Sequence, residues 1–92
     1  MKITFNAAKR AATLKERGLD FADATAVFAG RTFSAEDTRR DDGEIRINTV
    51  GELAGRLVIV CWTPRGESRR IVSMRKCNDR ETALYRQRLD PR

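Results

Sequence analysis

The chain has 92 residues, of which 19 are Lys or Arg and 13 are Asp or Glu, so its formal net charge is +6. Hydrophobic residues make up 40% and charged residues 35%, a composition typical of one small folded domain over residues 1–92. The apolar run 57–62 is far shorter than the ~20 residues that span a bilayer, and the first residues lack the apolar segment of a signal peptide. We therefore expect a cytoplasmic protein with no membrane contact.

The first part of the chain predicts a strand followed by a helix. Residues 2–5 have strand character, and Asn6 is a suitable N-cap for a helix over 7–17. Gly18 favours the left-handed conformation that ends such a helix.

The next part predicts a second helix, a brief strand and a loop. Asp20 can cap a helix that ends at Gly30. One face of this helix is apolar and is expected to meet the core; it carries Phe21, Ala24, Val27 and Phe28. Residues 32–34 form a possible short strand, and the polar stretch 35–43 has the composition of a surface loop.

The second half of the chain changes to a strand-like period of two. Apolar and polar residues alternate over 44–49, which places Glu44 and Arg46 on one polar face of a half-buried strand that ends at a turn within 51–55. The continuous apolar run 57–62 predicts the central strand of the sheet, covered on both faces.

After a turn at 64–67, residues 69–76 predict a strand loaded with cations. Strict alternation divides its side chains between two faces, with Arg70, Val72, Met74 and Lys76 on one and Arg69, Ile71, Ser73 and Arg75 on the other. Asn78 and Glu81 have the spacing of a capping box for a last helix, which ends near Leu89 because Pro91 follows. The element order β-α-α-β-β-β-β-α predicts an α+β fold with a twisted antiparallel sheet packed by helices.

The net positive charge lies in the last part of the chain. Residues 1–55 hold nine basic and nine acidic residues, whereas residues 56–92 hold ten basic and four acidic ones. A cationic surface attracts polyanions, so nucleic acid is the first partner to consider, while membrane surfaces and acidic proteins carry charge of the same sign. The chain has no histidine, which excludes His-dependent ribonuclease mechanisms, Ser–His triads and zinc–His sites. Its two cysteines fit no metal spacing and it has no phosphate-binding loop, so we expect no metal and no cofactor.

Six residues are candidates for catalysis on a phosphodiester: Glu44, Arg46, Arg70, Arg75, Lys76 and Tyr85. The three arginines can bind phosphate oxygens and stabilise developing charge, while Glu44, Lys76 or Tyr85 can move protons. Which of these three is the general base stays open. Each candidate also has a structural interpretation: the arginines and Glu44 can be solvated or paired in salt bridges, and Tyr85 can be core packing.

Four segments together resemble the BrnT family of bacterial type II toxins. They are F-N-x-x-K at 5–9, K-E-R-G-L-D-F-A-D-A-T-A-V-F at 15–28, D-G-E-I-R at 42–46 and R-I-V-S-M-R-K-C-N-D-R-E-T-A-L-Y at 70–85. The resemblance implies a RelE-like ribonuclease fold, RNA cleavage that arrests translation, and neutralisation by a BrnA-like antitoxin. It also implies that the toxin reaches operator DNA only indirectly, through the antitoxin.

Residues at the family's recurring positions are Lys9, Glu44, Arg46, Arg70, Ser73, Arg75, Glu81 and Tyr85. The candidate RNA-binding residues are Lys9 and Ser73, which belong to this set, together with Arg69 and Arg80 from the basic last part of the chain. The chain differs from the family pattern near its start, where Phe5-Asn6 replaces W-D, Thr13 replaces Asn and Arg17 replaces His.

The leading hypothesis is therefore a metal-independent endoribonuclease of a toxin–antitoxin system. The alternative is a non-catalytic regulatory module that uses the same basic face to bind nucleic acid or an antitoxin. A small transcription factor is disfavoured because no helix-turn-helix pattern is visible.

Overall fold

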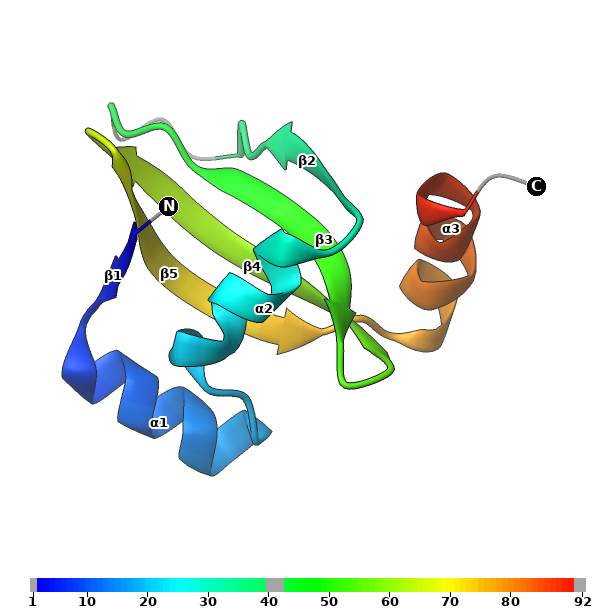
Figure 1. The fold of residues 1–92 in the computed structure, drawn as a ribbon, viewed down its shortest axis with the longest axis horizontal. Coiled ribbons are helices and arrows are strands. Elements are labelled where there is room, and N and C mark those ends of the chain that lie inside the picture. Colours follow the sequence, from blue (N-terminus) through cyan, green and yellow to red (C-terminus); the bar gives the residue numbers. More distant parts are fainter. Residues whose placement is uncertain (1, 40–42, 91–92) are drawn as a thin grey trace.

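The computed structural model describes residues 2–39 and 43–90. In chain order its elements are β1 (Lys2–Phe5), α1 (Ala7–Arg17), a 3₁₀ turn (Phe21–Asp23), α2 (Ala24–Ala29), β2 (Thr32–Glu36), β3 (Ile47–Leu53), β4 (Arg56–Arg65), β5 (Ser68–Lys76) and α3 (Asp79–Leu89). The predicted α+β class is confirmed (Figure 1).

The strands form one five-stranded sheet in the order β1-β5-β4-β3-β2. Strands β2 to β5 pair antiparallel as predicted. β1 instead lies parallel to β5 at the edge of the sheet, with Lys2 opposite Ser68 and Phe5 opposite Ile71. Alternation in a sequence identifies a strand but not its neighbour, and here the first strand borders the most basic one.

The predicted helix caps are present. The Asn6 side chain accepts a hydrogen bond from the Lys9 N–H at 3.0 Å, and Gly18 ends α1 with a φ of 68°. Asp20 caps a 3₁₀ turn rather than an α-helix, and α2 follows as a separate short helix. The second helix of the sequence prediction is therefore divided in two.

Strand boundaries differ from the prediction around the 35–43 stretch. β2 extends to Glu36, which pairs with Ile47, the first residue of β3. Glu44 and Arg46 consequently precede β3 instead of lying within it. Residues 40–42 of the predicted loop, like Pro91, lie outside the described residues.

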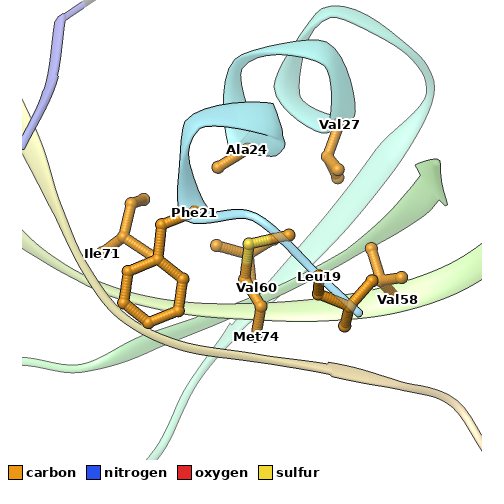
Figure 2. Packing of buried hydrophobic residues seen from close by; sticks show 8 residues of the cluster. All are labelled: Leu19, Phe21, Ala24, Val27, Val58, Val60, Ile71 and Met74. Carbon is orange, nitrogen blue, oxygen red and sulfur yellow. The ribbon is translucent and has the colours of Figure 1, made fainter. Parts of the chain in front are cut away.

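One face of the sheet is covered by the 3₁₀ turn and α2, which lie across it (Figure 1). Here the main core cluster forms from Leu19, Phe21, Ala24, Val27, Val58, Val60, Ile71 and Met74. Figure 2 shows these side chains converging between α2 and the strands. Removing this apolar area from water is the main stabilising contribution to the fold.

The opposite face is covered only in part: α3 lies at one end of the sheet (Figure 1), and its Tyr85 and Leu89 pack on this face. A second cluster there joins Val50, Leu57, Ile59 and Cys77 to Phe33, Tyr85 and Leu89. The predicted capping box starts α3: the Glu81 N–H donates to the Asn78 side chain at 2.8 Å, and the Asn78 N–H donates to the Glu81 carboxylate at 3.0 Å. The part of this face between α1 and α3 stays accessible.

The pairing of β4 with β5 contains one irregularity. Cys61 lies opposite Ser73, but the next residue, Trp62, lies opposite Ile71, so Val72 is an extra residue on β5. Such a bulge reverses the alternation of side chains beyond it. The strict alternation predicted for this strand is therefore wrong after the bulge.

The bulge decides which arginines share a face. Arg70 lies opposite Thr63 and Arg75 lies opposite Ile59, two β4 residues that point to the same side. Five positions apart, Arg70 and Arg75 would lie on opposite faces of a regular strand. The extra residue places both arginines on the accessible face, while Met74 points to the opposite face and lies in the main core cluster.

Candidate functional site

A cavity of about 730 Å³ lies on the accessible face of the sheet, between α1 and α3. Its lining comes from β2 to β5, from the segment before β3 and from both helices. The residues are Lys9, Thr13, Glu16, Arg17, Phe33, Ala35, Asp37, Arg39, Arg46, Asn48, Val50, Ile59, Cys61, Val72, Ser73, Arg75, Glu81 and Tyr85. We call it the larger pocket.

The floor of the larger pocket consists mainly of side chains that are either short or apolar. Cys61 on β4 lies between Asn48 on β3 and Ser73 on β5, and Ile59 lies beside Arg75. Burial raises the pKa of the Cys61 thiol above its ordinary value, so this cysteine is a neutral part of the floor at pH 7.

The charged groups around this floor are predominantly cationic. Five basic residues line the pocket, namely Lys9, Arg17, Arg39, Arg46 and Arg75, against the acidic Glu16, Asp37 and Glu81. A concave surface with an excess of positive charge concentrates anions, and arginine is well suited to phosphate.

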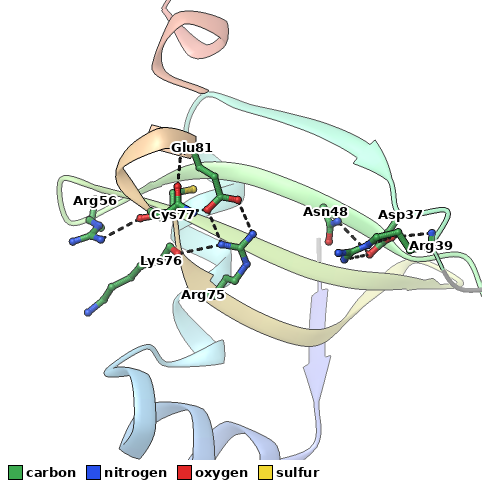
Figure 3. A network of polar contacts seen from close by, with 9 residues as sticks. Asp37, Arg39, Asn48, Arg56, Arg75, Lys76, Cys77 and Glu81 are labelled. Carbon is green, nitrogen blue, oxygen red and sulfur yellow. Dashed lines mark hydrogen bonds and ion pairs between the residues drawn. The ribbon is translucent and has the colours of Figure 1, made fainter. Parts of the chain in front are cut away.

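Arg75 is held by Glu81 at the α3 side of the pocket (Figure 3). The two guanidinium Nη atoms donate to the two carboxylate oxygens at 2.8 and 2.7 Å. The Arg75 hydrogen bond is the main cause that lowers the pKa of Glu81 to about 2, with the Asn78 N–H as the next cause. Glu81 is therefore ionised at pH 7 and is a weak proton acceptor.

A second ion pair lies at the β2 end, where Asp37 binds the Arg39 guanidinium at 2.8 and 2.9 Å (Figure 3). The Asn48 amide also donates to Asp37 at 3.4 Å. The Arg39 hydrogen bonds hold the pKa of Asp37 well below its usual range. Sequence analysis assigned Asp37 and Arg39 to a surface loop, and only the position of β2 shows that they border the pocket.

Tyr85 reaches the pocket from α3. Its ring packs edge-on against Phe33, with 5.2 Å between the ring centroids. The ring belongs to the second core cluster while the residue lines the pocket. Tyr85 therefore packs in the core, as its structural interpretation expects, and also borders the pocket.

On the opposite side, α1 is anchored to β5 by Arg17. Its Nη1 donates to the Met74 carbonyl at 2.7 Å. This bond fixes the end of the helix that supplies Lys9, Thr13 and Glu16 to the pocket.

A smaller pocket of about 160 Å³ adjoins the larger one. It is lined by Asn6, Lys9, Glu44, Arg46, Thr63, Arg65, Arg70, Ile71 and Val72. Lys9, Arg46 and Val72 line both pockets, so the two are contiguous. Glu44 forms an ion pair with Arg65, the salt bridge that was the alternative to its catalytic role.

Seven of the ten candidate residues lie around these two pockets. Ser73, Arg75 and Tyr85 line the larger one, Glu44 and Arg70 line the smaller one, and Lys9 and Arg46 line both.

Arg69, Lys76 and Arg80 line neither pocket. Arg69 lies on the α2 face, where its guanidinium stacks over Phe28 at 4.2 Å and over Trp62 at 4.8 Å. Lys76 lies opposite Val58, on the face of the sheet that carries the main core cluster. Arg80 is exposed on the first turn of α3.

Within residues 2–39 and 43–90, no group of three or more His, Cys, Asp or Glu side chains is arranged to hold a metal ion. No helix in these two ranges is both long enough and apolar enough to cross a membrane.

Comparison with known proteins identifies one family. Residues 5–81 match the family model described as the ribonuclease toxin BrnT of type II toxin–antitoxin systems. No curated protein matches the chain. The matched range includes β2 to β5, α1, α2 and the start of α3, but only the last residue of β1, and it contains most of both pockets. The chain therefore belongs to the BrnT family of ribonuclease toxins of type II toxin–antitoxin systems.

Proposed function

We propose that this chain is a metal-independent endoribonuclease that cuts RNA in the larger pocket and thereby inhibits translation. The observation that carries the proposal is the group of five basic side chains around one hollow, together with a tyrosine and without any histidine. Family membership supports the ribonuclease class.

The proposed reaction is attack of a ribose 2′-oxygen on the adjacent phosphorus atom. A base removes the 2′-proton, the new O–P bond forms, and the bond to the 5′-oxygen breaks as that oxygen takes up a proton. Arg75 and Arg46 hold the phosphate and stabilise the negative charge that develops on its oxygens. These fixed cations supply the electrostatic stabilisation that a metal ion provides in other nucleases.

Tyr85 is the proposed proton-transfer group in the larger pocket. Two of the three carboxylates there, Asp37 and Glu81, are bound to arginines that lower their pKa values, so they accept protons weakly at pH 7. The other two proposed bases are less well placed: Glu44 lines only the smaller pocket, and Lys76 lines neither.

The antitoxin is proposed to be a BrnA-like protein that carries the DNA-binding function, so that this chain reaches operator DNA only as part of the complex. An acidic surface on that partner would complement the basic face of the sheet. Type II systems pair a protein toxin with a protein antitoxin, which supports an antitoxin partner in general.

The test is to incubate purified protein with RNA in EDTA, alongside Arg75→Ala and the control Lys15→Ala. Lys15 is exposed on α1 and lines neither pocket, so its variant removes one positive charge outside the site. We expect the wild type and the Lys15 variant to cut RNA and Arg75→Ala to lose about 10²–10³-fold in rate. Equal cleavage by all three contradicts the assignment, and intact RNA with salt-sensitive binding supports the non-catalytic alternative.

A further inference from the structure

The smaller pocket is rich in groups that bind anions. Lys9, Arg46, Arg65 and Arg70 face a single carboxylate, Glu44. Four cations around a volume of about 160 Å³ match one compact anionic group such as a phosphate.

A buried hydroxyl gives an independent indication of a ligand. Thr63 lines the smaller pocket and is only 2% exposed, and its Oγ1 has no hydrogen-bond partner within the part of the chain that the structure describes. Buried polar atoms nearly always have a partner, because an unsatisfied one costs about 1–3 kcal/mol. An anionic oxygen in the pocket would accept this hydrogen bond.

The start of α1 adds further donors. Asn6 lines the smaller pocket, and because its Oδ1 already accepts the Lys9 N–H, its amide NH₂ group is left to donate. The first turn of α1 has no acidic residue to offset the positive end of the helix dipole. An 11-residue helix that begins beside a pocket favours an anion there.

We propose that the smaller pocket binds the phosphate next to the one that is cleaved, so that the RNA strand is held at two successive phosphates. The proposal rests on the proposed function, which places the scissile phosphate in the larger pocket. Lys9, Arg46 and Val72 line both pockets and provide the continuity that a single strand requires. Binding releases Arg65 from Glu44 in exchange for phosphate oxygens.

The experiment uses short RNAs in which a single ribose keeps its 2′-hydroxyl, so that only one linkage can be cut. In two further substrates the linkage before or after it is a neutral methylphosphonate. We expect one of these replacements to raise KM about tenfold with little change in kcat, because a hydrogen bond to a charged group is lost.

Thr63→Val and Arg70→Ala identify the pocket. In both variants, the methylphosphonate that raises KM for the wild type should leave KM unchanged. In the Lys15→Ala control, the same methylphosphonate should still raise KM about tenfold. Thr63→Val preserves side-chain shape, whereas Arg70→Ala shortens a half-buried side chain. The two substitutions differ in kind, so a folding defect in one leaves the other as a test. Neutral linkages that raise KM equally in the wild type and in both variants would overturn the proposal.

A binding measurement separates this proposal from the catalytic one. Fully 2′-O-methylated oligonucleotides cannot be cut, and their Kd should show the same dependence on one flanking charge and on Thr63 and Arg70. If wild-type protein cuts nothing but shows this dependence, the cleavage assignment fails and the subsite stands. A different result would overturn the proposal: inorganic phosphate binds at Thr63, but neither neutral linkage changes the Kd of the oligonucleotide. The smaller pocket would then be a site for a free anion.

Discussion

Arg75 and Glu81 form a two-pronged ion pair that joins the end of β5 to the first turn of α3. The same carboxylate accepts the Asn78 N–H, so one side chain stabilises the helix start and also neutralises a pocket arginine. The Arg75 side chain is 48% exposed and that of Glu81 19% exposed, so an incoming phosphate can compete for the guanidinium. The proposed role of Arg75 in phosphate binding and its ion pair with Glu81 therefore place opposing demands on this side chain.

Replacing Glu81 by Gln should separate these two demands. Glutamine can still accept the Asn78 N–H of the capping box, but it no longer carries the charge that binds Arg75. Because exposed ion pairs contribute about 0.2–1 kcal/mol, we expect KM for RNA to fall about twofold to fivefold while the free energy of unfolding decreases by a similar energy. Steady-state cleavage and urea unfolding measure the two effects. A variant with higher KM would show that Glu81 assists substrate binding.

The same residue makes stability depend on pH in the acid range. The pKa of Glu81 is about 2 in the folded protein, against an ordinary value of 4.5, because Arg75 and the Asn78 N–H stabilise the carboxylate. A lowered pKa stabilises the fold above pH 4.5 and this contribution is lost as pH falls toward 2. Urea unfolding of Glu81→Gln should therefore show a shallower loss of stability across this range than the wild type. Parallel curves for the two proteins would contradict the pairing.

Tyr85→Phe tests proton transfer without disturbing packing. The ring contact with Phe33 remains, so the melting temperature should change little. Loss of the phenol should lower kcat about 10²-fold or more, with KM unchanged, if this group moves the 2′-proton. Single-turnover cleavage across pH distinguishes a chemical defect from slow product release. An unchanged kcat would show that another group moves the proton, and Glu44→Gln would be the next variant to measure.

Thr49 is the centre of a small polar network in the core. Its Oγ1 accepts the Trp62 indole N–H at 2.8 Å and is hydrogen-bonded to the Ser34 hydroxyl at 2.7 Å. Thr49→Val should lower the free energy of unfolding by about 1–3 kcal/mol, because the indole N–H loses its partner. Trp62 is the only tryptophan, so its fluorescence reports the unfolding directly. Ser34→Ala is the matched control and should cost less, since Ser34 is exposed and water can replace it.

Gly51 allows α2 to approach β3 closely. A Cβ at this position would lie 2.7 Å from Val27 Cγ1 and 3.0 Å from Thr32 Cγ2. Gly51→Ala should therefore destabilise the fold by about 1–3 kcal/mol through overpacking. The double variant with Val27→Ala should be less affected by the added methyl group than the single variant is. Thermal unfolding of the wild type, the two single variants and the double variant gives the coupling free energy between positions 27 and 51.

The sequence by itself determined the features that depend on neighbouring residues. Local chemistry predicts the helix caps at Asn6 and Asn78 and the central apolar strand, and the structure confirms all three. The surplus of arginine in the last part of the chain is likewise a property of the sequence. The absence of histidine limits the possible chemistry whatever the fold.

Only the tertiary structure decided how these elements combine. Strand pairing placed Asp37 and Arg39 at the larger pocket, and the parallel pairing of β1 brought Lys9 beside Arg46. The extra residue Val72 placed Arg70 and Arg75 on one face. A bulge depends on the fit between two strands and has no period in the sequence, whereas a one-residue shift exchanges the faces of every side chain after it. The arginines could therefore be found from the sequence, but the side of the sheet on which they act could not.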